Sequence, residues 1–162
     1  MNTCKIIDTC TLINLFETIP VDISARFDVY DVLTTDVVIS EYTRKFPRKV
    51  PACVSVVGMS AKERIRISDF EFLFPNLGAG EISVFIKAST MASEGRRTVI
   101  LSDDKAAARK FHAISLDKSM CNILPGINGI LWGNALDVLK KLLSDGKISD
   151  EEYMFADSQL GH

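Results

Sequence analysis

The stretch "KIIDTCTLINLFE" (residues 5–17) decides the fold, because it joins a buried strand to a helix through a single acid. Two β-branched apolar residues precede Asp8, so residues 4–8 are predicted to form a short strand that is apolar on both faces. The apolar residues that follow recur at helical spacing, which predicts a helix directly after the strand. The sequence therefore places a carboxylate at the carboxyl end of a buried strand.

The rest of the chain repeats this alternation of apolar strands and amphipathic helices. Further strands are predicted around 37–39, at 98–102 and at "CNILP" (121–125), while 52–59 is interpreted as a strand or an extended link. Helices are predicted within 40–46, 61–74, 78–95, 103–119 and 128–144 and after 149. This order predicts a three-layer α/β/α fold with a central parallel sheet of four to five strands, in a single domain spanning 1–162.

The S-x-x-E spacing of Ser60 with Glu63 and of Ser149 with Glu152 predicts two capping boxes. Gly80 is interpreted as a residue that precedes the first turn of its helix, and Gly146 as the stop of the long helix.

Composition and charge limit the classes of protein that fit. At 47% hydrophobic and 25% charged residues the chain suits a globular domain, and no apolar run reaches the ~18 residues of a membrane span. The start shows no signal peptide, so we expect a cytoplasmic protein without membrane contact. The four cysteines have no C-x-x-C spacing, which argues against a zinc site.

Local basic clusters leave room for nucleic-acid binding, although the net charge of −2 argues against broad attraction to nucleic acid. In "RKFPRK" (44–49) we expect Arg44 and Lys45 to bind an RNA backbone. In "KAAARK" (105–110) we expect Lys105 and Arg109 to do the same. Solvated surface faces are the alternative interpretation of each cluster.

Acidic residues fall where the predicted strands end or where the following helices begin. Asp8 ends the first strand, and Asp103 and Asp104 end the third. Glu41 and Glu81 begin helices that can point at the same edge. Ligands of parallel sheets gather at the carboxyl ends of the strands, so we expect these acids to meet there. Taken singly, the glutamates also suit a first helical turn, and either Asp103 or Asp104 suits a helix N-cap.

Four acids in one cleft repel one another and need a compensating cation. At ~4 Å and an effective dielectric constant of ~20, each pair costs about 4 kcal/mol. An all-oxygen ligand set without cysteine or histidine selects Mg²⁺ or Mn²⁺ over zinc. Such an ion activates a water and stabilises charge on a phosphate, so the pattern predicts phosphodiester hydrolysis.

The same residues carry a resemblance to the PIN domain family. The four motifs that resemble those of the family are, in order, "IIDTCTLINL" (6–15), "VVISEY" (37–42), "LGAGEISVFIKA" (77–88) and "VILSDDKAAARK" (99–110). The tail "GINGILWGNALDVLKKLLSDGKISDEEY" (126–153) is similar to that of a PIN-like subgroup of uncharacterised function. The resemblance covers roughly residues 4 to 155 and implies a PIN-like, Rossmann-like nuclease fold.

What the resemblance implies is a ribonuclease that depends on Mg²⁺ or Mn²⁺. Many small members are VapC-like toxins of toxin–antitoxin pairs, which cut RNA, form homodimers and are inhibited by a small antitoxin protein. The implied catalytic acids and metal ligands are Asp8, Glu41, Glu81 and Asp104. Asp103 is the rival of Asp104 as a metal ligand, and the motif register favours Asp104.

Two positions depart from the family pattern. Cys10 stands where an Asn or Ser is common, and no clear fifth acid follows the fourth motif. We expect Asn128, or else Asn122, to be the nearest polar residue to that edge. Thr9 and Ser102 are predicted to support the metal ligands.

Two other functions fit parts of the pattern. A catalytically idle PIN-like module would keep the acids as helix caps and bind a protein partner through the helix at 128–144. An aspartate-nucleophile phosphatase would attack through Asp8, but Cys10 stands where its second acid is required. A metal titration separates the nuclease from the idle module, and a phosphorylated Asp8 would identify the phosphatase.

Overall fold

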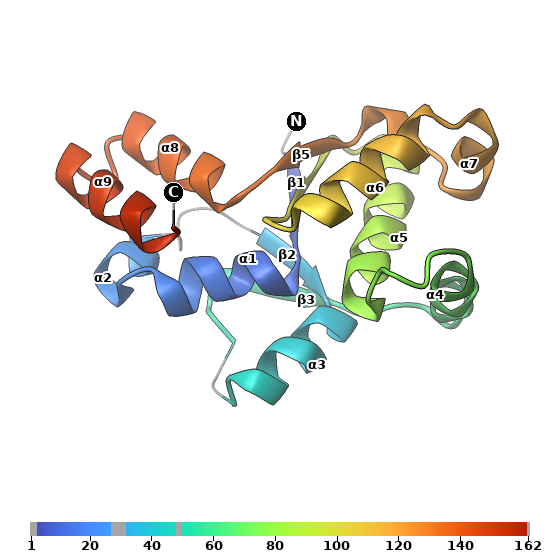
Figure 1. Cartoon of the computed structure of the whole chain (residues 1–162), viewed down its shortest axis with the longest axis horizontal. Helices are drawn as coiled ribbons and strands as arrows, with labels where there is room; N and C mark the ends of the chain where they lie inside the picture. The colour runs from blue at the N-terminus through green and yellow to red at the C-terminus, as the bar shows by residue number, and fades with distance from the viewer. Residues whose placement is uncertain (1–2, 27–31, 48–49, 162) are drawn as a thin grey trace.

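Parallel strands form the centre of the computed structural model, which describes residues 3–26, 32–47 and 50–161 (Figure 1). The five strands of the described residues form one sheet in the order β3-β2-β1-β4-β5, and every neighbouring pair is parallel. They are β1 (Cys4–Ile7), β2 (Val32–Thr35), β3 (Val54–Val57), β4 (Thr98–Leu101) and β5 (Leu131–Gly133). The predicted parallel sheet is confirmed.

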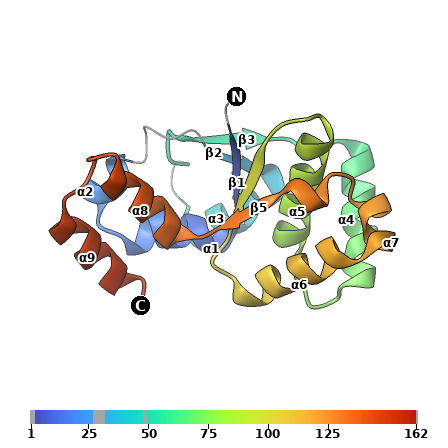
Figure 2. The same ribbon diagram turned by 90° about the horizontal axis from the view of Figure 1, so that it is seen from above.

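Helices cover both faces of this sheet, which gives the predicted three layers (Figure 2). On one face, α5 (Ala79–Ser93) packs against β4 and β5 through Phe85, with α4 (Ala61–Leu73) and α6 (Lys105–Leu116) beside it. On the other face lie α1 (Thr9–Ile13), its π-helical continuation η1 (Asn14–Thr18) and α8 (Ala135–Ser144). The remaining helices are α2 (Val21–Ser24), α3 (Asp36–Lys45), α7 (Lys118–Ile123), the 3-10 turn η3 (Ile127–Gly129) and α9 (Asp150–Gln159).

The opening strand and helix form as predicted, with an abrupt change of direction at Asp8. Ile6 and Ile7 are fully buried, as expected for the central strand of a sheet covered on both faces. The Asp8 side chain then accepts a hydrogen bond of 2.9 Å from the Thr11 amide, which caps the first turn of α1. The acid at the end of the strand is thus also the start signal of the helix.

The strand predicted around 37–39 is wrong, because those residues belong to α3. The strand ends at Thr35, whose hydroxyl accepts a hydrogen bond of 3.1 Å from the Val38 amide and so caps the helix. Burial of Val38 holds the β-branched run in helical form despite its weak intrinsic preference for it. As a result Glu41 lies in the second turn of α3 and not at its start.

The strand predicted at "CNILP" is also wrong, since that segment contains the end of α7. The fifth strand instead lies at Leu131–Gly133, inside the segment predicted as one long helix over 128–144. The helix that follows this strand, α8, begins only after Asn134. The Asn134 side chain accepts a hydrogen bond of 3.0 Å from the Asp137 amide. Short apolar runs fit a strand and a buried helix equally well, so periodicity alone could not separate them.

Both capping boxes predicted from the sequence are present. Ser60 and Glu63 start α4, and Ser149 and Glu152 start α9 through reciprocal hydrogen bonds of 3.0 and 3.1 Å. Gly146, at φ +71°, ends α8 as predicted. Among the helices of the described ranges, none combines the length and the apolar character needed to cross a membrane.

Candidate active site

The candidate site lies where the strand order of the sheet reverses direction. From β1 the chain adds β2 and β3 on one side, and β4 and β5 lie on the other. Such a switch point, at the carboxyl ends of the strands, is the usual ligand crevice of a parallel sheet. Ile7 pairs with Leu101, so Asp8 and Ser102 leave the sheet side by side. The Ser102 hydroxyl donates a hydrogen bond directly to the Asp8 carboxylate.

Asp8 is a buried carboxyl group, with a residue exposure of only 4%. One carboxylate oxygen accepts from the Thr11 amide and the other from the Ser102 hydroxyl. Burial raises the pKa of Asp8 to about 6, although both hydrogen bonds act in the opposite direction. The negative charge of Asp103 adds to the rise. Asp8 therefore keeps its proton more readily than an exposed aspartate does.

Glu81 and Asp104 form a second pair of acids next to Asp8. Glu81 is the third residue of α5, and the Gly78 amide donates it a long hydrogen bond of 3.3 Å. Asp104 caps α6 by accepting from the amides of Ala106 and Ala107 at 2.8 and 3.0 Å. Burial, followed by the hydrogen bond and charge of Asp104, raises the pKa of Glu81 to about 7. The Ala107 amide and then Glu81 lower the pKa of Asp104, so Glu81 holds a proton more readily than Asp104 does.

Glu41 reaches the same cleft from α3 and is held by two hydrogen bonds. The Thr9 hydroxyl donates to one carboxylate oxygen at 2.7 Å, and the Gly80 amide donates to the other at 3.0 Å. A Cβ on Gly80 would lie 2.8 Å from Oε1 of Glu41, so only a glycine leaves room for this carboxylate. Asp8, Glu41 and Glu81 line one hollow, which also contains Lys45.

Asp103 serves a different part of the structure from its neighbour Asp104. One carboxylate oxygen accepts from the Asn14 side chain at 2.9 Å, and the other accepts from the Ala135 amide at 3.0 Å. The Asp103 amide in turn donates to the Thr11 hydroxyl at 2.9 Å. Asp103 thus ties α1, η1 and the start of α8 together, whereas Asp104 lies against Glu81.

Sequence reasoning missed three residues that position the acids: Thr11, Asn14 and Gly80. Thr11 lies one helical turn from Asp8, and its polar side chain in an otherwise apolar stripe was a usable signal. The contact between Asn14 and Asp103 joins residues 89 positions apart, so the sequence carried no sign of it. Gly80 was interpreted only as a residue preceding the helix, although its role is to admit Glu41.

The structure places Asn128 away from the acids, which corrects the prediction that it lies at their edge. Asn128 is part of η3, which precedes β5 and therefore lies at the amino end of the strands. The preceding Gly126 contacts Ala92 near the end of α5, and Glu81 is at the beginning of that helix. Asn122 is exposed on α7 and does not line the cleft.

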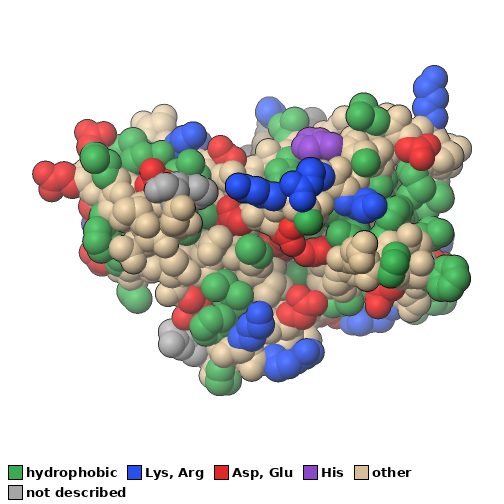
Figure 3. Space-filling model, viewed as in Figure 1, with side chains coloured by type: hydrophobic (Ala, Val, Ile, Leu, Met, Phe, Trp, Pro, Cys, Tyr) green, Lys and Arg blue, Asp and Glu red, His purple; other side chains and the backbone are tan. Residues whose placement is uncertain are grey.

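Basic side chains flank the acidic cluster on two sides (Figure 3). Arg44 and Lys45 are exposed in the last turn of α3, and Lys45 lines the hollow that contains Asp8. Lys105 and Arg109 are exposed on α6, where the charge of Arg109 helps to lower the pKa of Asp104. Arg48 and Lys49 of the first cluster lie outside the described residues.

The donor atoms of the cluster suit a hard divalent cation, but they do not yet form a complete metal site. In the described part of the chain, no group of three or more His, Cys, Asp or Glu side chains is arranged to hold a metal. No ion pair of those residues reaches Asp8, Glu41, Glu81 or Asp104 either. The negative charge thus has no cationic side chain bonded to it, and carboxylate oxygens are the ligands that Mg²⁺ and Mn²⁺ prefer. Binding an ion would favour the deprotonated form of Glu81.

Cys10 is exposed at the rim of the cluster but is not an activated thiol. Desolvation, followed by the charges of Asp8 and Asp103, raises the pKa of Cys10 to about 12. Since the thiolate is the nucleophilic form of cysteine, nucleophilic catalysis by this side chain is disfavoured at neutral pH.

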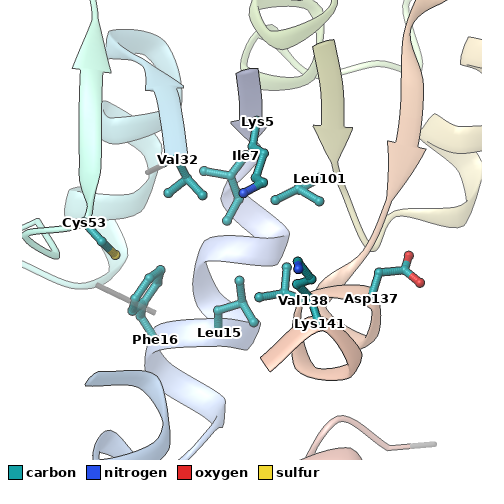
Figure 4. Close-up of a pocket in the computed structure, with 10 residues that line it drawn as sticks. All are labelled: Lys5, Ile7, Leu15, Phe16, Val32, Cys53, Leu101, Asp137, Val138 and Lys141. Carbon is teal, nitrogen blue, oxygen red and sulfur yellow. The ribbon is translucent and has the colours of Figure 1, made fainter. Parts of the chain in front are cut away.

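A second cavity, of about 120 Å³, lies on the face of the sheet that η1 and α8 cover (Figure 4). Most of its lining is apolar and includes Ile7, Leu15, Leu101 and Val138, but Lys5 and Lys141 line it as well. The Asp137 side chain at its border extends away from the other lining residues. None of Asp8, Glu41, Glu81 and Asp104 lines this cavity, so it lacks the acids that the predicted chemistry requires.

Comparison with known proteins identifies no family for the chain. It matches none of the protein-family models, curated proteins or solved structures with which it was compared. The resemblance to PIN domains therefore remains a prediction from the four motifs.

Proposed function

We propose that this chain is a metal-dependent endoribonuclease that hydrolyses RNA at the carboxyl edge of its sheet. The observation that supports this most is the meeting of Asp8, Glu81 and Asp104, from three distant segments, at the switch point. Burial raises the pKa of Asp8 and of Glu81, so the cluster disfavours the charged forms of these two acids. Groups perturbed in this way mark functional sites more often than structural ones.

The residues divide into ligands and groups that orient them. Asp8 and Asp104 would hold Mg²⁺ or Mn²⁺ through carboxylate oxygens, and Glu41 and Glu81 would ligate it directly or through water. Such an ion supplies Lewis acidity for the phosphate and lowers the pKa of a bound water. Ser102 and Thr9 fix the carboxylates of Asp8 and Glu41 by donating hydrogen bonds, which agrees with their predicted supporting role.

Glu81 is the residue suited to move a proton. With a pKa of about 7, its carboxyl group exists in both protonation states near neutral pH. General acid–base catalysis is most efficient when the pKa of the catalytic group is close to the working pH. Glu81 would accept a proton from the attacking water at one of its carboxylate oxygens.

The flanking basic residues supply the contacts for a polyanionic substrate. Lys45 and Arg44 on α3 and Lys105 and Arg109 on α6 border the acids from two sides. A single-stranded RNA crossing the cleft would place phosphates at both rows while one phosphodiester lies at the acids. On the family resemblance, a small antitoxin and a homodimeric assembly belong to the same proposal.

Cleavage of a fluorescent single-stranded RNA by the purified chain tests the proposal. We expect cleavage with Mn²⁺ or Mg²⁺, none with a chelator, and loss of at least about 100-fold in Asp8→Asn. Asp117→Asn is the matched control, because Asp117 is also an N-cap aspartate but lies on the remote helix α7. Unchanged cleavage by Asp8→Asn would refute the proposed site, and trapping a phosphoryl group on Asp8 would favour the phosphatase.

A second candidate function, the catalytically idle module, is favoured by one observation. Each acid of the cluster already accepts hydrogen bonds that cap or join helices, such as those from Thr11 to Asp8 and from Ala107 to Asp104. Thermal denaturation with millimolar Mn²⁺ separates the two functions. A nuclease site gains stability by binding the ion to the folded state, and this gain should disappear in Asp8→Asn. An idle module shows the same melting temperature with and without Mn²⁺.

A further inference from the structure

An apolar groove with an acidic rim lies at the end of the molecule formed by α2 and α9. Its lining residues are Pro20, Asp22, Ile23, Glu151, Glu152 and Phe155. Both ribbon views place α2, α8 and α9 together at one end of the molecule, away from α4 and α7 (Figures 1 and 2). The groove shares no lining residue with the hollow at Asp8.

Phe155, an apolar side chain that lines this groove, is 52% exposed. Val21 and Met154, which adjoin lining residues in the sequence, are 77% and 69% exposed. The inner face of α9 is occupied by Tyr153, Ala156 and Leu160, which pack against the core, so Met154 and Phe155 project outward. Exposed apolar groups clustered in this way, with a polar rim, are typical of interaction sites.

Carboxylates surround these apolar side chains with one sign of charge. Residues 20–26 and 150–159 carry Asp22, Asp150, Glu151, Glu152 and Asp157 and a single basic residue, Arg26, which follows α2. Arg26 is already engaged with Glu152 at 2.8 Å and with the Lys147 carbonyl at 2.9 Å. Among the ion pairs of the described residues, none includes Asp22, Asp150 or Glu151.

We propose that this groove, defined here as the α2–α9 groove, binds a cationic amphipathic peptide segment of another protein. The exposed apolar side chains supply the contact area, and the carboxylate rim selects Lys and Arg around the apolar residues of the partner. The same rim repels RNA and anionic membrane surfaces, so those polyanions are disfavoured as occupants. The proposal does not depend on nuclease activity.

The opposite end of the molecule shows why charge is needed to identify an occupant. On α4, Phe72 is 89% exposed and Ile65 65%, so the apolar exposure there is as large. Basic and acidic residues, such as Arg66 and Glu71, alternate along that helix and favour no particular partner. Phe72 therefore provides a matched control for Phe155.

Selection from a phage-displayed library of random peptides on the immobilised full-length chain tests the proposal. We expect the enriched peptides to carry net positive charge together with large apolar residues, and their binding to weaken as salt is added. For peptides resynthesised from the selection, Phe155→Ser should reduce affinity at least tenfold. The double variant Asp22→Asn with Glu151→Gln should reduce it by a similar factor, while Phe72→Ser should leave it within twofold. Circular dichroism of each variant confirms that the fold is retained.

Several outcomes would overturn the proposal. One is enrichment of acidic or uncharged peptides, or a selection that enriches no peptide at all. Another is affinity that does not change in Phe155→Ser. Sedimentation of the chain alone gives a third: a dimer that Phe155→Ser converts to a monomer would mean that a second copy occupies the groove. RNA binding that weakens in the same variant would identify a nucleic-acid surface instead.

Discussion

Glu63 and Glu81 occupy the same position in two consecutive helices, yet their surroundings are opposite. Each is the third residue of its helix and accepts the amide at the N-cap, from Ser60 at 3.0 Å and from Gly78 at 3.3 Å. Glu63 also receives a hydrogen bond of 2.8 Å from Lys87, and both of these side chains are nearly buried. Among the ion pairs of the described residues, none includes Glu81, which lies against Asp104 and Asp8.

The difference shows that a glutamate at the same capping position can serve either stability or chemistry. Burial alone would raise the pKa of Glu63, but Lys87 and Ser60 outweigh it, so the pKa lies below its usual value. Burial raises the pKa of Glu81 to about 7 because its neighbour is another acid. A capping acid that is given a cation contributes to stability, whereas one placed among acids remains available for chemistry.

The largest effect that separates the two residues is expected on RNA cleavage. Glu81→Gln retains the hydrogen bond to the Gly78 amide but removes the negative charge and the titrating proton. We expect metal-dependent cleavage to fall by at least about 100-fold, with little change in the free energy of unfolding. Cleavage of a fluorescent RNA and urea denaturation measure the two quantities. Full activity in this variant would show that Glu81, like Glu63, has only a structural role.

The reverse pattern is expected for Glu63→Gln. This variant leaves the Lys87 ammonium group without its carboxylate in a largely buried position. Breaking such a pair should lower the free energy of unfolding by about 3 kcal/mol, while cleavage per folded molecule stays unchanged. Urea denaturation with a parallel cleavage assay checks this, and a loss of activity without a loss of stability would contradict it.

The pH dependence of stability tests the same effect of burial on a third carboxyl group, that of Asp8. Its pKa rises from 3.8 to about 6 on folding, so the unfolded chain loses this proton first. The contribution of Asp8 to the free energy of unfolding is fully present below pH 3.8 and is lost as the pH rises through about 6. Asp8→Asn removes the cost of burying the charge, so we expect it to stabilise the fold by about 1–3 kcal/mol at pH 8. The gain should vanish near pH 4, and urea denaturation at the two pH values provides the test.

The smallest effect is expected at Gly80, which makes room for Glu41 and donates its amide to that carboxylate. In Gly80→Ala the new methyl group displaces the Glu41 carboxylate, while the helical position itself accepts alanine. We expect about tenfold lower cleavage and a change in stability within about 1 kcal/mol. Gly129→Ala is the control, since a Cβ there contacts nothing within 4 Å. Equal cleavage by the two variants would remove the role assigned to Gly80.

Much of the fold could be predicted because local signals and burial agreed. The capping residues Ser60 and Ser149 and the buried strands at residues 4 and 98 are marked by patterns that tertiary packing does not override. At Val37–Ile39 the β-branched run predicted a strand, but the segment is helical because Thr35, two residues before the run, caps a helix that begins at Asp36. The short strand Leu131–Gly133 was missed because it exists only through pairing with β4.

The site was predictable as far as it follows from topology. Asp8, Glu81 and Asp104 could be brought together because the ends of parallel strands share an edge. The division of labour between Asp103 and Asp104 depends on contacts from Asn14 and Ala135, which are remote in sequence. The position of Asn128 was missed because it depended on the misplaced fifth strand.

The central position of the first strand has a consequence for the newly synthesised protein. Asp8 leaves the ribosome early, but the hydroxyl that it contacts belongs to a residue 94 positions later. A fragment that ends before β4 can therefore pair β1 with β2 yet carries no assembled cluster. For a chain that we propose cuts RNA, this delay keeps the growing polypeptide harmless to the message from which it is being translated.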